Sequence, residues 1–295
     1  MNYEKNIYDA LGKDILSIEE VSHSNNIVFK VVMKSKEVYY AKIYLSNSSH
    51  IDHELDLYEL INNKYLKELV YSTSNPKMAI YKELKGRTVD SLIDNEMIKY
   101  SDKIVDSLCD FFDSISNIHV NGYGILDKKM NGTSSSFEEF IVKRQSETSN
   151  KLKDYPYLAN LFKAIYSKYR EIIIGDNTLI PIDTNMKNIM VLDDGSIKFI
   201  DPGELISGSK LMGYGDFVAH SYKTILYDKL ITRLNLSCND KKLLRIYAIF
   251  SSLNILAFLH DLGVEDLASV IPFGNKYTFY NLISEHIEVL DIDRK

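Results

Sequence analysis

Cysteine is scarce in this sequence, with two among 295 residues. Cys109 and Cys238 show neither paired nor metal-ligand spacing, which argues against a disulfide framework and against a cysteine-based metal site. We therefore expect free thiols and a cytoplasmic location, with a disulfide between the two residues as the alternative.

An excess of basic residues is also lacking, because 41 Asp and Glu outnumber 35 Lys and Arg and give a net charge of -6. Broad, non-specific binding of nucleic acid depends on a basic surface that neutralises many phosphates. Nucleic acid is therefore not an expected partner. The acidic balance is compatible with a cationic ligand.

Long apolar runs are missing as well. The first five residues lack the apolar run of a signal peptide, and no later run is expected to reach membrane-spanning length. No membrane partner is therefore expected. The 45% hydrophobic and 26% charged residues are ordinary for a globular protein, and the length allows one large or two medium domains.

The most informative stretch of the chain is residues 179–203. Two short apolar runs, Ile189–Leu192 and residues 197–200, are joined by Asp-Asp-Gly at residues 193–195. Alternating apolar runs joined by such a turn are typical of a β-hairpin, because Gly accepts the positive φ that tight turns need.

Each arm of this hairpin carries polar residues at one end. Asp183 comes five residues before Asn188, and Asp201 directly follows the second run. Oxygen ligands grouped in this way suit Mg²⁺, and the remaining carboxylate can accept a proton from an attacking hydroxyl. The stretch predicts a phosphoryl-transfer site.

Upstream, the alternation of apolar and polar residues predicts a meander of three strands near residues 15–21, 27–33 and 38–44. Strand-like patterns return at residues 69–72 and 78–83. The polar turn after the first strand could cradle phosphate oxygens through its N–H groups, and an ordinary hairpin loop is the alternative.

Lys42 lies at the centre of the third predicted strand. An unpaired buried lysine is costly, so this side chain either points to solvent or has a carboxylate or phosphate nearby. Apolar residues at three- and four-residue spacing predict an amphipathic helix over residues 51–63, with Ser48-Ser49 as the cap. Glu54 and Glu59 are its candidate partners for Lys42.

Gly86 marks the end of the strand-like pattern, and helical periodicity dominates beyond it. We expect residues 1–85 to form a nucleotide-binding lobe and residues 86–295 a helical lobe with the catalytic loop and the acceptor site. The linker at residues 82–86, through the backbone of Lys82 and Leu84, is the expected contact for an adenine edge.

Helices are expected in the second lobe, with a loop punctuated by Gly208, Gly213 and Gly215 before a helix that begins at Asp216. His119 is expected to be structural. The expected helices cover residues 100–119, 137–149, 157–174, 216–235, 240–262 and 276–290.

Taken together, these residues resemble the aminoglycoside phosphotransferase and choline kinase superfamily, small-molecule kinases with a protein-kinase-like fold. In that superfamily the catalytic loop typically reads H-G-D-x-x-x-x-N and is followed by two strands and an I-D-x-G-like turn. Here residues 181–188 read Pro-Ile-Asp-Thr-Asn-Met-Lys-Asn and residues 200–203 read Ile-Asp-Pro-Gly. The chain departs from the pattern at Pro181 and Ile182, where the superfamily usually has His and Gly.

The resemblance implies an α+β, two-lobed fold, with a small antiparallel sheet and one helix in the first lobe and a larger, mainly helical second lobe. It implies that Asp183 orients the acceptor hydroxyl and takes its proton, and that Asn188 and Asp201 coordinate Mg²⁺. Lys42 would contact the α- and β-phosphates and pair with Glu54.

The resemblance also implies further roles in the two lobes. Ser24 and Asn26 are similar to the superfamily's nucleotide-binding loop before the second strand. Asp216 resembles a second acid that braces the catalytic loop.

The function that this resemblance implies is ATP-dependent (or GTP-dependent) O-phosphorylation of a small hydroxylated acceptor, such as an aminoglycoside-like or other cationic antibiotic. One alternative is a metabolic kinase for choline, an amino alcohol or a sugar. Another is an inactive kinase-fold binding module, suggested by Pro181 and Ile182. The sequence leaves these alternatives open. The acidic candidates for meeting an amine in the acceptor site are Glu204, Asp216, Glu265 and Asp266, and solvated helix faces are the alternative.

Overall fold

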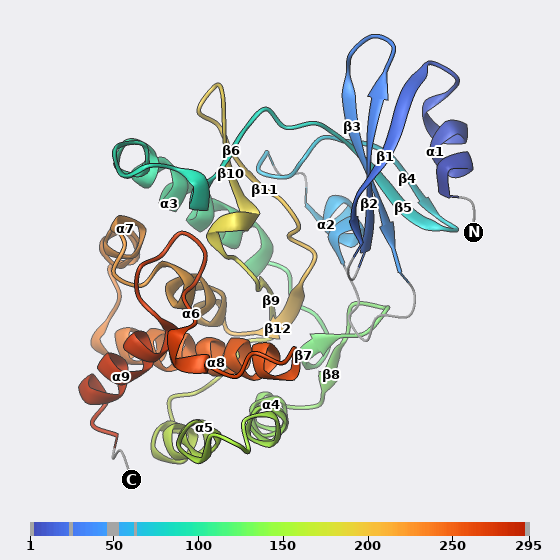
Figure 1. The fold of residues 1–295 in the computed structure, drawn as a ribbon. Coiled ribbons are helices and arrows are strands. Elements are labelled where there is room, and N and C mark those ends of the chain that lie inside the picture. The colour runs from blue at the N-terminus through green and yellow to red at the C-terminus, as the bar shows by residue number, and fades with distance from the viewer. Residues whose placement is uncertain (1–2, 24–25, 46–52, 62–63, 293–295) are drawn as a thin grey trace.

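Two lobes of unequal size make up the structure (Figure 1). It is a computed structural model that describes residues 3–23, 26–45, 53–61 and 64–292. The first lobe is rich in β-strands and the second is mainly helical, so the predicted α+β, two-lobed fold is confirmed. Ser24 and the cap candidates Ser48-Ser49 lie outside the described residues.

The small lobe is built on a five-stranded antiparallel sheet in the order β1-β2-β3-β5-β4. Burial alternates along β2, as the period of two predicted, and Val31 packs in one core with Ala41 and Ile43 of β3. The last four residues of β3 are all buried, so both faces of that strand are covered there. The strands are β1 (Ile15–His23), β2 (Asn26–Met33), β3 (Val38–Tyr44), β4 (Leu69–Ser74) and β5 (Lys77–Lys82).

Two helices cover this sheet, where the sequence analysis expected one. The predicted helix is α2 (Glu54–Leu60). The additional helix is α1 (Tyr3–Leu11), which buries Ile7 completely in the core formed by one face of the sheet. A helix this short is marginal by itself, and it is held here by packing of its apolar stripe, so only the sheet makes it stable.

The linker leads into β6 (Gly86–Thr88), which pairs with the predicted hairpin of β10 (Ile189–Leu192) and β11 (Ile197–Phe199). A Cβ on Gly86 would overlap the Val191 carbonyl oxygen, so only glycine allows this close pairing. The linker therefore reaches the hairpin that the predicted site residues flank.

The large lobe contains the remaining helices and a four-stranded sheet in the order β8-β7-β12-β9. Its strands are β7 (Tyr123–Leu126), β8 (Gly132–Ser134), β9 (Thr178–Pro181) and β12 (Leu205–Gly208). Its helices are α3 (Asp94–Ser116), α4 (Phe137–Lys151), α5 (Pro156–Tyr169), α6 (Lys210–Ser221), α7 (Ile225–Leu234), α8 (Cys238–Asp261) and α9 (Phe279–Val289), with single turns η1 (Val89–Ser91), η2 (Met186–Asn188) and η3 (Leu267–Ser269).

Helix α6 corrects the expectation that a helix begins at Asp216. It begins at Lys210, so Gly213 and Gly215 lie inside the helix rather than in a loop. A Cβ on Gly215 would lie 2.6 Å from Tyr247 Cβ of α8. The glycines therefore let α6 approach its neighbours, a reason that a local sequence pattern does not reveal.

By length and composition, helix α8 is long and apolar enough to cross a membrane. This contradicts the expectation that no apolar run of the chain reaches membrane-spanning length. Most of its apolar window, 61%, is buried inside the protein, where Ile246, Ile249 and Leu253 belong to the core of the large lobe. The apolar length of α8 thus reflects a core position. Both cysteines are free, with Cys109 buried and Cys238 exposed.

Candidate active site

Asp183 occupies the loop between β9 and η2 with a positive φ of 61°. Asn185 Nδ2 donates to its Oδ1 over 2.7 Å, and Asn188 Nδ2 donates to its Oδ2 over 3.0 Å and to its backbone oxygen over 2.9 Å. Two amides thus fix the carboxylate in one orientation. The positive φ of a non-glycine residue is uncommon and is typical of functional loops.

The protonation of Asp183 is shifted towards the acid form. Asp183 is exposed to solvent in the cleft, yet neighbouring protein atoms partly desolvate its carboxyl group. This desolvation raises its pKa, the negative charges of Asp216 and Glu204 act in the same direction, and the two asparagine hydrogen bonds oppose them. The result is a pKa of about 7, which suits a general base at neutral pH.

Asp216 braces this loop from the buried side. Its Oδ2 accepts the N–H of Thr184 over 2.9 Å and the Thr184 hydroxyl over 3.2 Å. Its Oδ1 accepts the hydroxyl of Ser251 on α8 over 2.5 Å. The structure therefore shows the bracing role that the resemblance implied for Asp216.

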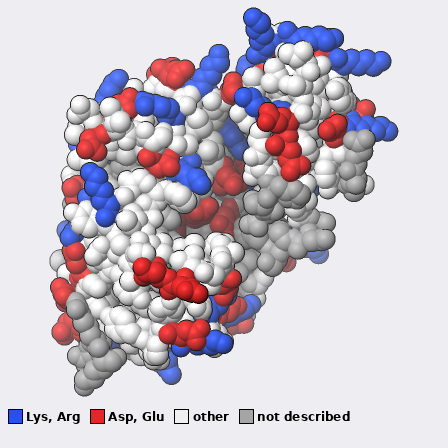
Figure 2. All heavy atoms as spheres, viewed as in Figure 1, with Lys and Arg blue, Asp and Glu red and all other residues white. Residues whose placement is uncertain are grey.

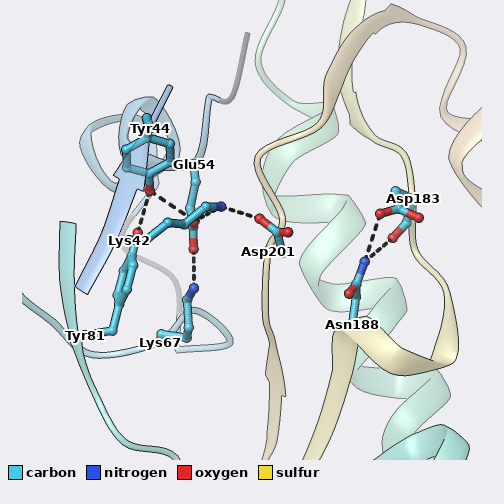
Figure 3. Close-up of polar contacts among 8 residues, drawn as sticks. All are labelled: Lys42, Tyr44, Glu54, Lys67, Tyr81, Asp183, Asn188 and Asp201. Carbon is cyan, nitrogen blue, oxygen red and sulfur yellow. Dashed lines mark hydrogen bonds and ion pairs between the residues drawn. The ribbon is translucent and has the colours of Figure 1, made fainter. Parts of the chain in front are cut away.

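Lys42 and Glu54 form a buried ion pair across β3 and α2 (Figure 3). The distance from Lys42 Nζ to Glu54 Oε2 is 2.9 Å, and Glu54 is completely buried. Of the two candidate partners, Glu59 is exposed. The same Nζ contacts Asp201 Oδ1 at the end of the hairpin, so Lys42 joins the small lobe to the predicted metal ligand.

Lys67 is a second partner of Glu54 that sequence reasoning missed. Its Nζ lies 2.6 Å from Glu54 Oε1, and 3.8 Å from the centre of the Tyr81 ring. Tyr44 donates its hydroxyl to Glu54 Oε2 over 3.1 Å. Lys67 lies in the polar connection between α2 and β4, where no local pattern distinguishes it from a solvent-exposed lysine.

Glu54 stays ionised in spite of its burial. Burial alone would raise its pKa, but the positive charges of Lys67 and Lys42 and their hydrogen bonds outweigh that effect and lower it to about 2. The pair therefore provides a fixed negative charge that holds the Lys42 ammonium in place.

Asp201 lies between Lys42 on one side and Asn188 and Asp183 on the other (Figure 3). The Ile200 N–H donates to the Asn188 backbone oxygen over 2.8 Å, which ties the two predicted metal ligands together. The Asn188 NH₂ group is bonded to Asp183, so its side-chain oxygen is the atom that remains for a cation.

This donor set fits Mg²⁺ bound together with a nucleotide. Among the described residues, no group of three or more His, Cys, Asp or Glu side chains could hold a metal ion alone. Mg²⁺ is commonly bound by one or two protein oxygens and completes its octahedral shell with water and phosphate oxygens. Asn188 and Asp201 would supply the protein oxygens.

The predicted nucleotide contacts are only partly placed. Asn26 begins β2 opposite Tyr44, on the strand that pairs with the strand of Lys42. The Lys82 N–H already donates to the Glu68 carbonyl over 3.1 Å, so it is not available to an adenine. The Lys82 side chain is exposed. The Leu84 N–H makes no hydrogen bond to any described residue, and it remains the predicted linker contact.

A further contact between the lobes involves His53, which the sequence analysis did not single out. This buried residue directly precedes α2, and its N–H donates to the Gly203 carbonyl over 2.9 Å. The start of the helix that carries Glu54 is therefore bonded to the turn that follows Asp201.

The hollow between the two lobes is acidic (Figure 2). Asp and Glu side chains gather at its floor, and both Glu204 and Asp216 lie close enough to Asp183 to raise its pKa. Glu265 and Asp266 lie elsewhere, between α8 and η3, where the Glu265 carbonyl accepts a hydrogen bond from the Tyr155 hydroxyl.

His119 was expected to be structural. Its ring forms a hydrogen bond with the Asn177 side-chain oxygen over 3.0 Å.

Solved structures of small-molecule kinases have the same overall fold as this chain. No family model and no curated protein sequence matches this chain. A thermostable mutant of aminoglycoside phosphotransferase APH(4)-Ia, in ternary complex with AMP-PNP and hygromycin B, superposes with a TM-score of 0.67 at 14% identity, covering 99% of this chain and 97% of that chain. The chain has the fold of the aminoglycoside phosphotransferase and choline kinase superfamily.

Two other solved structures match over a similar share of the chain. Choline kinase LicA from Streptococcus pneumoniae has a TM-score of 0.65 at 15% identity over 99% of both chains. A putative fructosamine-3-kinase from Thermobifida fusca has a TM-score of 0.62 at 10% identity over 97% of both chains. At these identities the likeness shows the superfamily fold and leaves the substrate undetermined.

Proposed function

We propose that this protein is an ATP-dependent (or GTP-dependent) O-phosphotransferase that phosphorylates a hydroxyl of a small molecule in the cytoplasm. The observation that carries the proposal is the placement of Asp183, held by two amides, beside the Asn188–Asp201 pair and across the cleft from the buried Lys42–Glu54 pair. Phosphoryl transfer depends mainly on such positioning and charge neutralisation.

Each residue has a defined part in the proposed reaction. Asp183 would orient the acceptor hydroxyl and accept its proton, while the acceptor oxygen bonds to the γ-phosphorus and the bond to the leaving ADP oxygen breaks. Lys42, held by Glu54, would neutralise the α- and β-phosphates. Mg²⁺ bound at Asn188 and Asp201 would neutralise the remaining phosphate charge.

The departures at Pro181 and Ile182 leave this geometry intact. Pro181 ends β9 opposite Leu205, and the Ile182 N–H donates to the Glu204 carbonyl over 2.9 Å. Backbone pairing therefore fixes the start of the loop without a histidine. This supports an active enzyme over the inactive binding module, which was suggested by these two residues alone.

For the acceptor, we propose a cationic hydroxylated compound such as an aminoglycoside-like antibiotic. The acidic hollow between the lobes favours an amine near the reacting hydroxyl, where the negative charges of Glu204 and Asp216 also act on Asp183. The solved phosphotransferase that binds AMP-PNP and hygromycin B supports this choice. The likeness to a choline kinase supports the second candidate, a metabolic kinase for choline, an amino alcohol or a sugar.

ADP release, measured with ATP, Mg²⁺ and a panel of aminoglycosides, choline, amino alcohols and sugars, tests the proposal. Turnover should occur with one acceptor class and fall at least about a hundredfold in Asp183→Ala. That variant should still bind a fluorescent ADP analogue. Asp193→Ala, which removes an exposed carboxylate in the hairpin turn, is the matched control. Full turnover in Asp183→Ala would overturn the assigned role.

A further inference from the structure

A second pocket in the large lobe is lined by residues of helices α6, α7, α8 and α9. These helices lie on the side of the lobe away from the small lobe (Figure 1). The pocket opens to solvent at Lys241, and its volume is about 40 Å³. Its apolar walls are Val218, Ile231 and Leu244. One water needs roughly 10–15 Å³ of such space, so the pocket has room for a group the size of a phosphate or carboxylate.

The polar side chains of this pocket are donors or cations. Lys241 and Arg245 come from the first turns of α8, Tyr227 from α7 and His286 from α9. Neither Lys241 nor Arg245 forms an ion pair with any residue in the described parts of the chain. Lys241 is exposed to solvent at the rim, whereas Arg245 is half-buried, so Arg245 is the cation that an anionic occupant would compensate most.

His286 gives an independent indication. The residue is only 3% exposed, its ring packs edge-on against Tyr222, and its Nε2 has no hydrogen-bond partner among the described residues. Burial and the nearby Arg245 charge lower the pKa of His286 to about 3, so the ring is neutral and can donate from Nε2–H. A buried polar atom without a partner is costly, and a ligand in the pocket would satisfy it.

The acidic groups around the pocket are occupied or face solvent. Glu285 accepts the Tyr222 hydroxyl over 2.8 Å and pairs with Lys223 over 2.5 Å. Asp228 is exposed. Asp240 accepts the Ser237 hydroxyl over 2.7 Å at the start of α8. None of these carboxylates lines the pocket, so no acidic side chain of its wall offsets the charge of Arg245 and Lys241.

We propose that this pocket binds a small oxyanion, such as the phosphate or carboxylate group of a metabolite, through Arg245 and Lys241 with His286 Nε2 as the inner donor. The site is separate from the nucleotide cleft, but both share α6. Val218 lines the pocket, and Asp216 braces the catalytic loop two residues earlier, so the two side chains point to roughly opposite sides of the helix. The inference does not depend on the proposed phosphotransferase activity.

Inorganic phosphate is the probe for this site. Thermal unfolding and calorimetric titration of the full chain, at constant ionic strength, should show binding that is at least about tenfold weaker in Arg245→Gln, because one charge-assisted contact is lost. Lys242→Gln, which removes an exposed cation outside the pocket on the same helix, is the control and should bind like the wild type. Chloride should not replace phosphate, and equal binding of chloride would overturn the proposal.

Phosphate could also enter the nucleotide cleft, so the titration is repeated in Lys42→Ala. Retained binding in that variant supports the second site, and lost binding overturns it. Circular dichroism checks that Arg245→Gln is folded. Independently, the ¹⁵N resonances of the His286 ring should shift on phosphate addition to the wild type, and an unmoved His286 signal would overturn the proposal even if Arg245→Gln failed to fold.

Discussion

Lys67 Nζ lies 2.6 Å from Glu54 Oε1, and Lys42 Nζ lies 2.9 Å from the other carboxylate oxygen. One buried carboxylate is therefore held by two ammonium groups, one on each oxygen. Lys42 also contacts Asp201, so it is shared between two acids. Because Lys67 also contacts Glu54, the negative charge of Glu54 stays paired even when Lys42 interacts mainly with Asp201. Lys67 therefore acts as a positioning residue for the Lys42–Glu54 pair.

Replacing Lys67 by Met should lower the free energy of unfolding at pH 7 by about 2 kcal/mol, because Glu54 keeps only one of its two cations. The pKa of Glu54, about 2 in the folded protein against an ordinary 4.5, also contributes about 3 kcal/mol above pH 4.5. That stability is lost as the pH falls from 4.5 towards 2. In Lys67→Met the pKa of Glu54 rises, so the variant should lose less unfolding free energy than the wild type as the pH falls.

Urea unfolding at pH 7 and pH 3 measures both effects of Lys67→Met. Lys67→Arg keeps the charge and should behave nearly like the wild type, and Lys64→Met removes an exposed lysine of the same connection as a control. Identical acid dependence in Lys67→Met and wild type would contradict the role assigned to Lys67.

Asp183→Asn should become more stable relative to the wild type as the pH rises. The pKa of Asp183, raised to about 7 in the folded protein, means that ionisation destabilises the fold as the pH rises from about 4 through 7. Asn never ionises, so its advantage in melting temperature should grow from pH 5 to pH 8. Because solvent screens the open cleft, the gain should not exceed about 2 kcal/mol. Melting curves of Asp183→Asn and of Asp193→Asn as control test this, and a difference that is constant with pH would refute it.

Replacing Asp216 should change the pH dependence of the proposed activity as well as stability. Asp216→Ala leaves the Thr184 N–H without its acceptor and should cost about 2 kcal/mol. Asp216→Asn keeps an acceptor oxygen and should cost less. Both variants remove a negative charge that raises the pKa of Asp183, so the acidic limb of the turnover profile should move to lower pH. An unmoved limb in Asp216→Asn would limit Asp216 to a structural role.

Gly215→Ala should destabilise the protein by about 1–3 kcal/mol, because the new Cβ would lie 2.6 Å from Tyr247 Cβ and force α6 away from α8. Helix propensity alone would give the opposite sign, a gain of about 1 kcal/mol. Ser146→Ala on the exposed side of α4 is the control for propensity. Chemical denaturation distinguishes the two effects, and a net gain in Gly215→Ala would show that the helices are not in tight contact.

The strands, the hairpin and most helices followed from local patterns because each is encoded within its own residues. Strand β3 has the predicted bounds, and the Asp-Asp-Gly turn joins β10 to β11 as expected. The exceptions depend on distant packing. Helix α1 exists because Ile7 packs on the sheet, and α6 begins early because its glycines face other elements. Neither reason is visible in a window of neighbouring residues.

The sequence by itself determined the chemistry of the cleft: which residues could accept a proton, bind a cation or hold a phosphate, and in what order they follow along the chain. Only the tertiary structure decided how these groups act on one another. The pairing of Lys67 with Glu54, the brace from Asp216 to Thr184 and the raised pKa of Asp183 join residues from separate elements. Charge interactions and burial depend on distance in space, which the spacing of residues along the chain does not set.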